Sequence, residues 1–467
     1  MAAGTDFTKG NLMRQLVVLS FTSSIGIVAI YFVDLMDIFF ISLLGHREMA
    51  AAASFAGTVM FFISSVNIGI SVASGSLTAQ YLGSGRRREA DDLTASATVI
   101  SAIVAVVLSI AMYPFFPQFV SLLGAEGVVA EMAVTYLQIV VPTSFLSGMS
   151  MSLVASMRGH GFAKWAMYPA LFGALVNLVF DPILIFGLDL GLAGAAWATN
   201  LARVATFGLC LLATARMFKT VSRPDTAMVL RHKDEIFFYA LPAVLSSIAA
   251  PIGIAIITRH FDKYGSEAVA GFAVIARISP VVFAVVSAMS SMLGPMIGQN
   301  FSAGLHNRAR QAYYDGIKFL AIYVAVLIVF LMIFRNSIAD AFSAEDLTRD
   351  LILFFCGPFA MIGFFNGMIF NASAAVSNLG HPKIAPRLNW AKNTVGLVAF
   401  TSVGSYLFGI YGLAVGILLN AALFAAVGHI MTLRIMDQAK TETVPEPEEE
   451  FDEAEHINLE YGEPTYT

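Results

Sequence analysis

The stretch GALVNLVFDPILIFGLDLGLAGAAWATNLAR, residues 173–203, decides the fold, because it places an aspartate inside a long apolar segment. Asp181 is followed directly by Pro182, and Asn177 lies one helical turn earlier on the same face. An ionised carboxylate at the centre of a bilayer costs at least ~2.5 kcal/mol on insertion scales. We therefore expect Asp181 to be paired, protonated or bound to an ion.

The composition is that of a polytopic membrane protein. Of the 467 residues, 57% are hydrophobic and 13% are charged, whereas soluble proteins carry about 25% charged residues. The two cysteines, Cys210 and Cys356, lie in apolar runs without metal-ligand spacing, so we expect neither a disulfide framework nor a zinc site. The short polar N-terminus lacks a cleavage site, so we expect no removable signal peptide.

Twelve apolar runs are long enough to cross a bilayer as helices. They fall at residues 15–43, 50–82, 93–117, 128–157, 165–188, 191–216, 235–260, 266–300, 311–335, 347–378, 384–409 and 411–436.

The second half of the chain repeats the first at a spacing of about 220 residues. AQYLGSGRRREA (79–90) matches GQNFSAGLHNRA (298–309), and MRGHG (157–161) matches NLGHP (378–382). Because each unit has an even number of spans, both units point the same way. The prediction is an all-α membrane protein of two parallel six-helix repeats, related by a pseudo-twofold axis along the membrane normal.

The distribution of lysine and arginine predicts the orientation. Twenty of them fall on the side of the two termini and five on the other side, with Arg203 and Arg277 inside spans. The positive-inside rule then places both termini in the cytoplasm. The same rule explains the basic run at residues 86–88, so we expect no nucleic-acid binding.

These observations divide the chain into five segments. Residues 437–467 hold 11 acids and one base, a composition that predicts a disordered tail. The remaining membrane body has 21 acids and 26 bases. The predicted segments are a cytoplasmic N-terminus (1–14), a six-helix lobe (15–216), a cytoplasmic linker (217–234), a second six-helix lobe (235–436) and the acidic tail (437–467).

Three acids lie deep within spans, and all three belong to the first repeat: Asp34, Asp37 and Asp181. The second repeat has hydroxyl or apolar residues at the equivalent positions, including Thr401 or Ser402 opposite Asp181. A purely structural need would act on both repeats, so the asymmetry indicates a function carried by the first. Low dielectric favours a protonated carboxyl, and carboxylate, amide and hydroxyl oxygens also suit a small hard cation such as Na⁺.

The alternative for these acids is a structural ion pair, with Arg203 as the candidate partner. Arg277 in the eighth span could bind a carboxylate or backbone carbonyls, and we keep it with Asp34 and Arg203 as a further candidate for substrate binding or coupling.

Several motifs resemble the multidrug and toxic compound extrusion (MATE) transporter family over residues 10–436. They are MDIFFISLLGHREMAA (36–51), SMRGHGFAKWAM (156–167) and, most specifically, VNLVFDPILIFGLDLGLAGAAWAT (176–199). The resemblance implies an antiporter that exports cationic or amphiphilic compounds against an inward flow of H⁺ or Na⁺. It also implies a coupling site made of Asp37, Asn177, Asp181 and Thr199; Thr199 is supplied by the resemblance alone.

The chain departs from one branch of that family. NorM-like members carry acids in the seventh and tenth spans, whereas SSIAAPIGIAI (246–256) and FFNGMIFNASAAV (364–376) contain none. The chain therefore looks closer to the DinF-like branch. Family members often have a proline early in the first span, but this chain has none at that place, near Thr22. Asp34 is a further acid outside the family pattern.

The function predicted is secondary active multidrug efflux by H⁺ or Na⁺ antiport, with no enzymatic activity and no cofactor. The absence of GxxxxGK[ST] gives no sign of ATP as the energy source. A flippase for lipids or lipid-linked substrates and a membrane receptor are the alternatives. Only Arg203 and Arg277 lie within spans, against three acids, which favours cationic over phosphate-bearing substrates. We expect a monomer in the plasma (inner) membrane of a prokaryote, with small-molecule substrates and membrane lipid as partners.

Overall fold

The computed structural model describes residues 4–44, 47–217 and 225–441, and all regular structure in these ranges is helical. In a bilayer, helices satisfy every backbone polar group within the segment. The first half contains α1 (Leu12–Leu43), α2 (Arg47–Gly83), α3 (Arg87–Met112), η1 (Tyr113–Phe115), α4 (Phe116–Leu122), α5 (Gly127–Val140), η2 (Val141–Thr143), α6 (Ser144–Gly159), α7 (Ala163–Pro182), η3 (Ile183–Gly187) and α8 (Gly191–Met217).

The second half has the same sequence of long helices and short interruptions. It contains α9 (Thr226–Asp262), α10 (Ser266–Val282), α11 (Ala284–Ser302), α12 (His306–Ala341), α13 (Asp346–Phe355), η4 (Pro358–Met361), α14 (Ile362–Asn378), α15 (Ile384–Ala391), η5 (Lys392–Gly396) and α16 (Leu397–Thr441). Prolines stand at the start of the 3₁₀ segments η1, η2 and η4, because proline removes the hydrogen bond that an α-helix needs there.

Twelve membrane spans can be counted within the described residues. Ten helical segments are long and apolar enough to cross a membrane, and the pair α10 and α11, bent by 47°, adds an eleventh. The segment Ile384–Gln438 contains two spans, because Phe408 and Gly409 leave the helical conformation inside α16. The expected all-α, twelve-span fold in two repeats is therefore confirmed.

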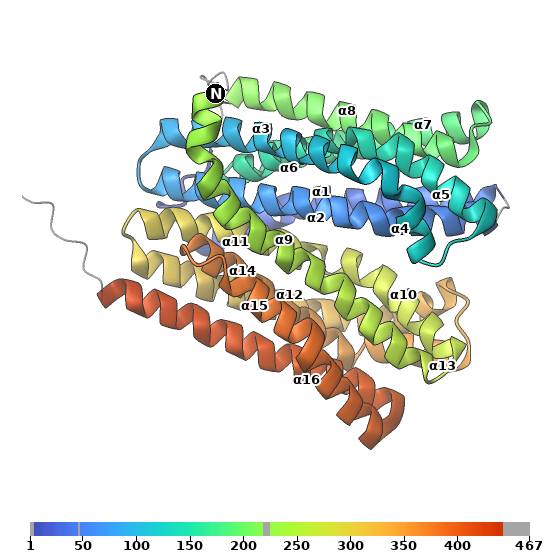
Figure 1. Cartoon of the computed structure of the whole chain (residues 1–467). Coiled ribbons are helices and arrows are strands. Elements are labelled where there is room, and N and C mark those ends of the chain that lie inside the picture. The colour runs from blue at the N-terminus through green and yellow to red at the C-terminus, as the bar shows by residue number, and fades with distance from the viewer. Residues whose placement is uncertain (1–3, 45–46, 218–224, 442–467) are drawn as a thin grey trace, which may run out of the picture.

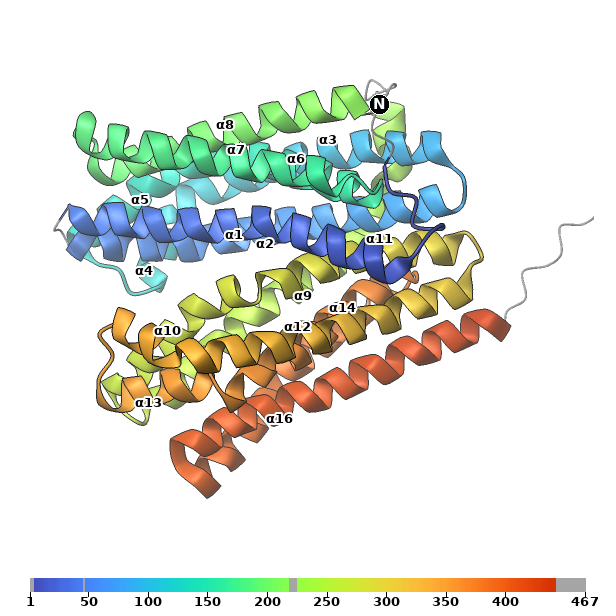
Figure 2. The same cartoon turned by 180° about the vertical axis from the view of Figure 1, so that it is seen from behind.

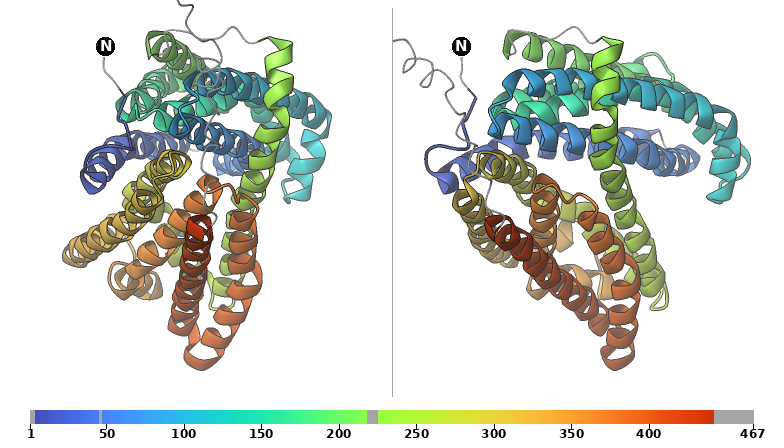
Figure 3. Two further views of the ribbon diagram at one scale, coloured as in Figure 1. Left: turned by 90° about the vertical axis from the view of Figure 1, so that its left-hand side faces the viewer. Right: turned by 60° about the vertical axis from the view of Figure 1, so that its left-hand side comes forward.

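The spans form two lobes that converge at one end of the molecule. Figure 1 shows α1 to α8 in one lobe and α10 to α16 in the other, with α9 running between them. The two views of Figure 3 separate the same two groups. Both ends of the described chain lie at the end where the lobes converge, and the lobes diverge toward α5 and α13 at the opposite end (Figures 1 and 2). We call the converging end the terminal end.

Gln299 of α11 ties the two lobes together at the terminal end. Its side-chain amide donates to the carbonyl of Gly159 in α6 at 2.6 Å, and its oxygen accepts from the backbone N–H of Phe7 at 3.3 Å. Phe7 is completely buried, and its carbonyl accepts from Asn300 at 2.9 Å. The N-terminal segment is thus packed between the lobes.

The segment boundaries differ from the sequence prediction at two places. The predicted linker, 217–234, is helical from Thr226 onward as the start of α9, and its residues 218–224 lie outside the described part. The predicted tail begins as the last turn of α16, which continues to Thr441, and residues 442–467 lie outside the described part. Charged residues in both helical extensions hide them from a search for apolar runs.

Candidate ion-binding site and inter-lobe cavity

Asp37, Asn177 and Asp181 form one polar cluster inside the first lobe. Because the amide can be assigned from its hydrogen bonds, its nitrogen is placed toward the acids, where it donates to Asp37 Oδ1 at 2.8 Å and to Asp181 Oδ2 at 3.1 Å. The two carboxyl groups also lie within hydrogen-bonding range of each other. The packing of α1 against α7 therefore unites an acid of the first span with the Asn–Asp pair of the fifth.

The cluster is shielded from solvent. Asp181 is 0% exposed and Asn177 is 3% exposed, while Asp37 is half-buried. Asp181 Oδ1 is buried and has no hydrogen-bond partner among the described residues. Because an unpaired buried carboxylate oxygen is costly, this atom marks the place where a proton or a cation would be bound.

The backbone changes its winding directly after the acid. Asp181 and Pro182 end α7, and residues Ile183–Gly187 continue as one turn of π-helix, η3. Proline prevents the regular hydrogen bond to the preceding turn, and π turns are frequent at functional sites. Gly194 of α8 allows close packing here, because a Cβ on it would lie 2.7 Å from the carbonyl oxygen of Leu184.

Tyr136 of α5 belongs to the same site and was missed by the sequence prediction. Its phenol group lies beside the side chain of Thr199 and within electrostatic range of Asp37 and Asp181. Thr199 itself donates to the carbonyl of Ala195 at 3.0 Å. A tyrosine within an apolar run gives no sequence signal for such a role.

Arg203 is held by the backbone of a neighbouring helix, and no ion pair with Asp181 is found. Its guanidinium donates to the carbonyl of Val140 at 2.5 Å and to the hydroxyl of Thr143 at 2.9 Å. The same hydroxyl donates to Asn200 at 2.6 Å. Arg203 therefore anchors α8 to the junction of α5 and η2, and the structural ion pair considered for the acids is absent from the described structure.

The two remaining candidate residues lie outside this cluster. Asp34 is exposed on α1 and forms no hydrogen bond with the described residues. Arg277 is exposed on α10 in the second lobe, and no ion pair or hydrogen bond to its side chain is found in the described chain. The structure therefore brings Asp37, Asn177 and Asp181 into direct contact, whereas Thr199 bonds to the backbone of its own helix and lies beside Tyr136.

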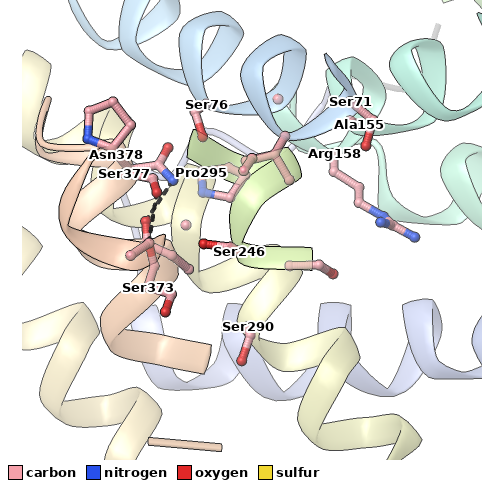
Figure 4. Close-up of a pocket in the computed structure, with 18 of the residues that line it drawn as sticks. Ser71, Ser76, Ala155, Arg158, Ser246, Ser290, Pro295, Ser373, Ser377 and Asn378 are labelled. Carbon is pink, nitrogen blue, oxygen red and sulfur yellow. Dashed lines mark hydrogen bonds between the residues drawn. The ribbon is translucent and has the colours of Figure 1, made fainter. Parts of the chain in front are cut away.

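A separate cavity of about 290 Å³ lies between the two lobes. Serine, glycine, alanine and proline dominate its walls, which come from α2, α6, α9, α11, α14 and α15 (Figure 4). Arg158 and Asn378 are its largest polar side chains, and no acidic residue lines it.

Two of the twenty basic residues that the sequence analysis counted on the side of the termini, Arg158 and Lys392, lie against the protein interior. Arg158 stands in the last turn of α6 and lines the inter-lobe cavity. Lys392 begins η5, and its ammonium donates to the amide oxygen of Asn366 at 2.6 Å. The position of a basic residue beside an apolar run predicts that it lies near a helix end, but it does not reveal which way the side chain points.

A two-lobed bundle of twelve spans with a buried acid cluster defines a polytopic membrane transporter. The family model MatE matches residues 22–183 and 242–401, so the chain belongs to the MatE family. The two matches cover equivalent parts of the two repeats. Members of this family are transporters rather than enzymes.

Known relatives extend over nearly the whole chain. It is 27% identical over 444 residues to the FAD transporter of Shewanella oneidensis, covering 92% of this chain and 96% of that protein. It is 22% identical over 436 residues to the multidrug export protein MepA of Staphylococcus haemolyticus, covering 92% and 95%. A solved multidrug resistance MATE family transporter of the MOP superfamily, in an outward-facing conformation, superposes with a TM-score of 0.86 at 22% identity, covering 94% and 100%. The protein is therefore an integral membrane transporter of the MATE fold.

Proposed function

We propose that the protein is a secondary active exporter that couples the outward movement of an amphiphilic small molecule to the inward movement of H⁺ or Na⁺. The observation that carries the proposal is the pair of the half-buried Asp37 and the buried Asp181, linked by the amide of Asn177. Tyr136 and Thr199 complete the proposed coupling site. Two acids so close together in a dry interior need a positive charge between or beside them.

The same side chains suit either ion by different means. A single proton shared between the two carboxyl groups would hydrogen-bond one to the other and relieve their repulsion. For Na⁺, rotation of the Asn177 amide by 180° would turn its oxygen toward the carboxylates, and three oxygens would converge on the ion. The unpaired Asp181 Oδ1 offers a further acceptor in either case.

Alternating access follows from rocking of the two lobes about their contact. With both termini in the cytoplasm, as the distribution of basic residues predicts, the contact through Gln299 closes the cytoplasmic side. The conformation would then face the outside, where the coupling ion enters in an antiport cycle. Localisation in the plasma membrane of a prokaryote is part of the same proposal.

The first candidate substrates are organic cations or amphiphilic drugs, since MepA relatives are named multidrug export proteins. A flavin dinucleotide is the second candidate, because the relative from Shewanella oneidensis, named FAD transporter, has the higher identity, 27% against 22%. A flippase acting on a lipid-linked substrate shares the architecture and remains the third possibility for the assay below.

The test is efflux from proteoliposomes with a pH gradient and a Na⁺ gradient imposed separately. Ethidium and FAD serve as the organic cation and the flavin dinucleotide, and a fluorescent lipid reports flipping. We expect one of the two gradients to drive export. Asp37→Asn and Asp181→Asn should lower it to the level of empty liposomes, because a neutral amide cannot exchange the coupling charge.

The matched control is Asp189→Asn, which makes the same change at an exposed position after η3. It should export like the wild type. All variants are first checked for monodisperse behaviour in detergent. Normal gradient-driven export by either Asp37→Asn or Asp181→Asn would contradict the coupling assignment.

A further inference from the structure

The inter-lobe cavity carries one fixed positive charge. Arg158 Nε is buried without a hydrogen-bond partner among the described residues, and no ion pair involving this guanidinium is found there. Arg158 is half-buried, and an arginine in such a place normally pairs with a carboxylate or phosphate, yet the cavity walls contain no acid. The charge therefore has no counterpart within the cavity.

Hydroxyl groups from both lobes surround the same space. Ser71 and Ser76 come from α2, and Ser246 comes from α9. None of the three donates a hydrogen bond to another described residue, and Ser246 Oγ is buried. Most of the remaining serines are already bonded to their own helices, as Ser377 is to the carbonyl of Ser373 at 2.8 Å (Figure 4). The unused donors thus line the same cavity as Arg158.

The other unsatisfied atom of the wall is Asn378 Oδ1, on the opposite lobe from Arg158. The amide of this residue donates to the carbonyl of Ala374 at 2.9 Å, which leaves the oxygen unpaired. Gly294 provides room for the amide, since a Cβ there would lie 2.7 Å from its nitrogen. Buried polar atoms without partners on both sides of a cavity indicate a polar occupant. Because Asn378 Oδ1 only accepts hydrogen bonds, it would bind a donor group of that occupant, such as a hydroxyl, and not a phosphate.

We propose that this cavity binds a phosphate group of an amphiphilic substrate, with Arg158 as the charged anchor and the hydroxyls of Ser71, Ser76 and Ser246 as further donors. Arginine presents several N–H groups in a fork that fits phosphate oxygens. A tetrahedral phosphate accepts hydrogen bonds from several directions, as these donors require, whereas a planar carboxylate would use fewer of them. The small wall residues leave the space open.

The volume limits how much of the substrate fits. Small-molecule pockets are commonly ~300–1,000 Å³, so about 290 Å³ accommodates a head group while the apolar remainder lies outside it. The proposal rests on the proposed transport function and specifies its substrate class. It is independent of the coupling ion, because equilibrium binding needs no gradient.

Arg158 also has a structural explanation, because a cation in the last turn of α6 interacts favourably with the helix dipole. A dipole interaction predicts no preference for phosphate. The experiment therefore compares two ligands that differ only in that group: flavin mononucleotide and riboflavin, the same molecule without phosphate. Binding is measured by fluorescence anisotropy on the full-length protein in neutral nanodiscs.

We expect the wild type to bind flavin mononucleotide at least about tenfold more tightly than riboflavin, in line with a charge-assisted contact. Inorganic pyrophosphate should compete. Arg158→Gln should abolish the preference, and Arg158→Lys should restore part of it. The control Arg88→Gln removes an exposed arginine at the start of α3 and should keep the preference for flavin mononucleotide over riboflavin. Equal affinity for both flavins in the wild type, or an unchanged preference in Arg158→Gln, overturns the proposal.

A second arm identifies the source of the phosphate. Nanodiscs containing phosphatidic acid should leave binding of flavin mononucleotide unchanged if the site serves a soluble substrate. If phosphatidic acid instead competes with flavin mononucleotide in the wild type, and this competition is lost in Arg158→Gln, the result supports the phosphate site and assigns it to a lipid head group. If Arg158→Gln does not fold, the double variant of Ser76→Ala and Ser246→Ala must lower the phosphate preference at least about threefold, or the proposal fails. Failure of any of these tests leaves ion-driven export of ethidium intact, and failure of coupling leaves the binding result intact.

Discussion

Replacing Gln299 by alanine should open the terminal end of the molecule. Gln299 joins the lobes through two hydrogen bonds, to the carbonyl of Gly159 at 2.6 Å and from the N–H of Phe7 at 3.3 Å. The side chain is only 5% exposed. Both bonds need the lobes in contact, so their loss weakens the closed conformation and leaves the conformation with separated lobes unaffected.

The size of the effect follows from the number of bonds. Each hydrogen bond contributes a net ~0.5–1.5 kcal/mol, because the separated groups regain water at the membrane surface. Two bonds give ~1–3 kcal/mol, which changes the ratio of closed to open molecules by about 5- to 150-fold. Other contacts at this end remain, so the variant should populate both conformations.

The populations can be measured by electron paramagnetic resonance with two spin labels. Arg88→Cys and Asn307→Cys place labels on exposed positions of opposite lobes at the terminal end. The native Cys210 and Cys356 are buried, which limits background labelling. We expect a short distance between the labels to dominate in the labelled wild type. In Gln299→Ala, the population with a longer distance should increase.

The control for this measurement is Gln311→Ala, the same change on an exposed face of α12. Its distance distribution should match that of the wild type. If Gln299→Ala shifts the ratio of the two distances by less than about twofold, the bonds through Gln299 do not hold the lobes together, and the reasoning is refuted.

Two further predictions concern packing and the acid cluster. Gly83→Ala should open the terminal end in the same spin-label assay, because its Cβ would lie 2.3 Å from the carbonyl oxygen of Gln299. The neutral control is Gly57→Ala, since a Cβ there would have nothing within 4 Å. The same distribution of label distances in both variants would contradict the steric argument. Asn177→Leu should abolish ion-driven efflux and lower the free energy of unfolding by ~1–3 kcal/mol, because both acids lose the bridging amide. The control Asn420→Leu in the second lobe should also lower stability but keep ion-driven efflux. Ion-driven export that persists in Asn177→Leu would count against the proposed coupling role of the cluster.

The fold could be predicted because it depends on signals that are continuous along the chain. Apolar runs of spanning length and a repeat of about 220 residues give the twelve spans and the two lobes. The fifth span, predicted at 165–188, corresponds to α7 and η3, which run from Ala163 to Gly187. The start of α9 at Thr226 was missed, since a helix that leaves the membrane no longer needs apolar residues all round.

The site could be predicted only in part, because its members come from different helices. The spacing of Asn177 and Asp181 places them on one face of a single helix. Their contact with Asp37 depends on the packing of α1 against α7, which was expected from family resemblance and not from spacing. Tyr136 carries no charge and lies within an apolar run, so its proximity to the acids appears only once α5 is placed.

Counting charges within spans is a poor guide to the charge that a substrate meets. The count of three acids against Arg203 and Arg277 favours cationic substrates. In the structure, however, Asp37 and Asp181 are joined through Asn177, and Arg203 is bonded to the backbone of Val140. Charges used in this way are not free to recognise a ligand.

The charge left unpaired at the inter-lobe cavity is positive. From the sequence, Arg158 was counted only as one of the basic residues on the cytoplasmic side, yet it lines a space that contains unused hydroxyl donors and no acid. An organic cation would be repelled there, whereas a phosphate would be attracted. Among the candidate substrates, the cavity therefore favours a phosphate-bearing amphiphile over a cationic drug, and the comparison of flavin mononucleotide with riboflavin tests this preference for phosphate.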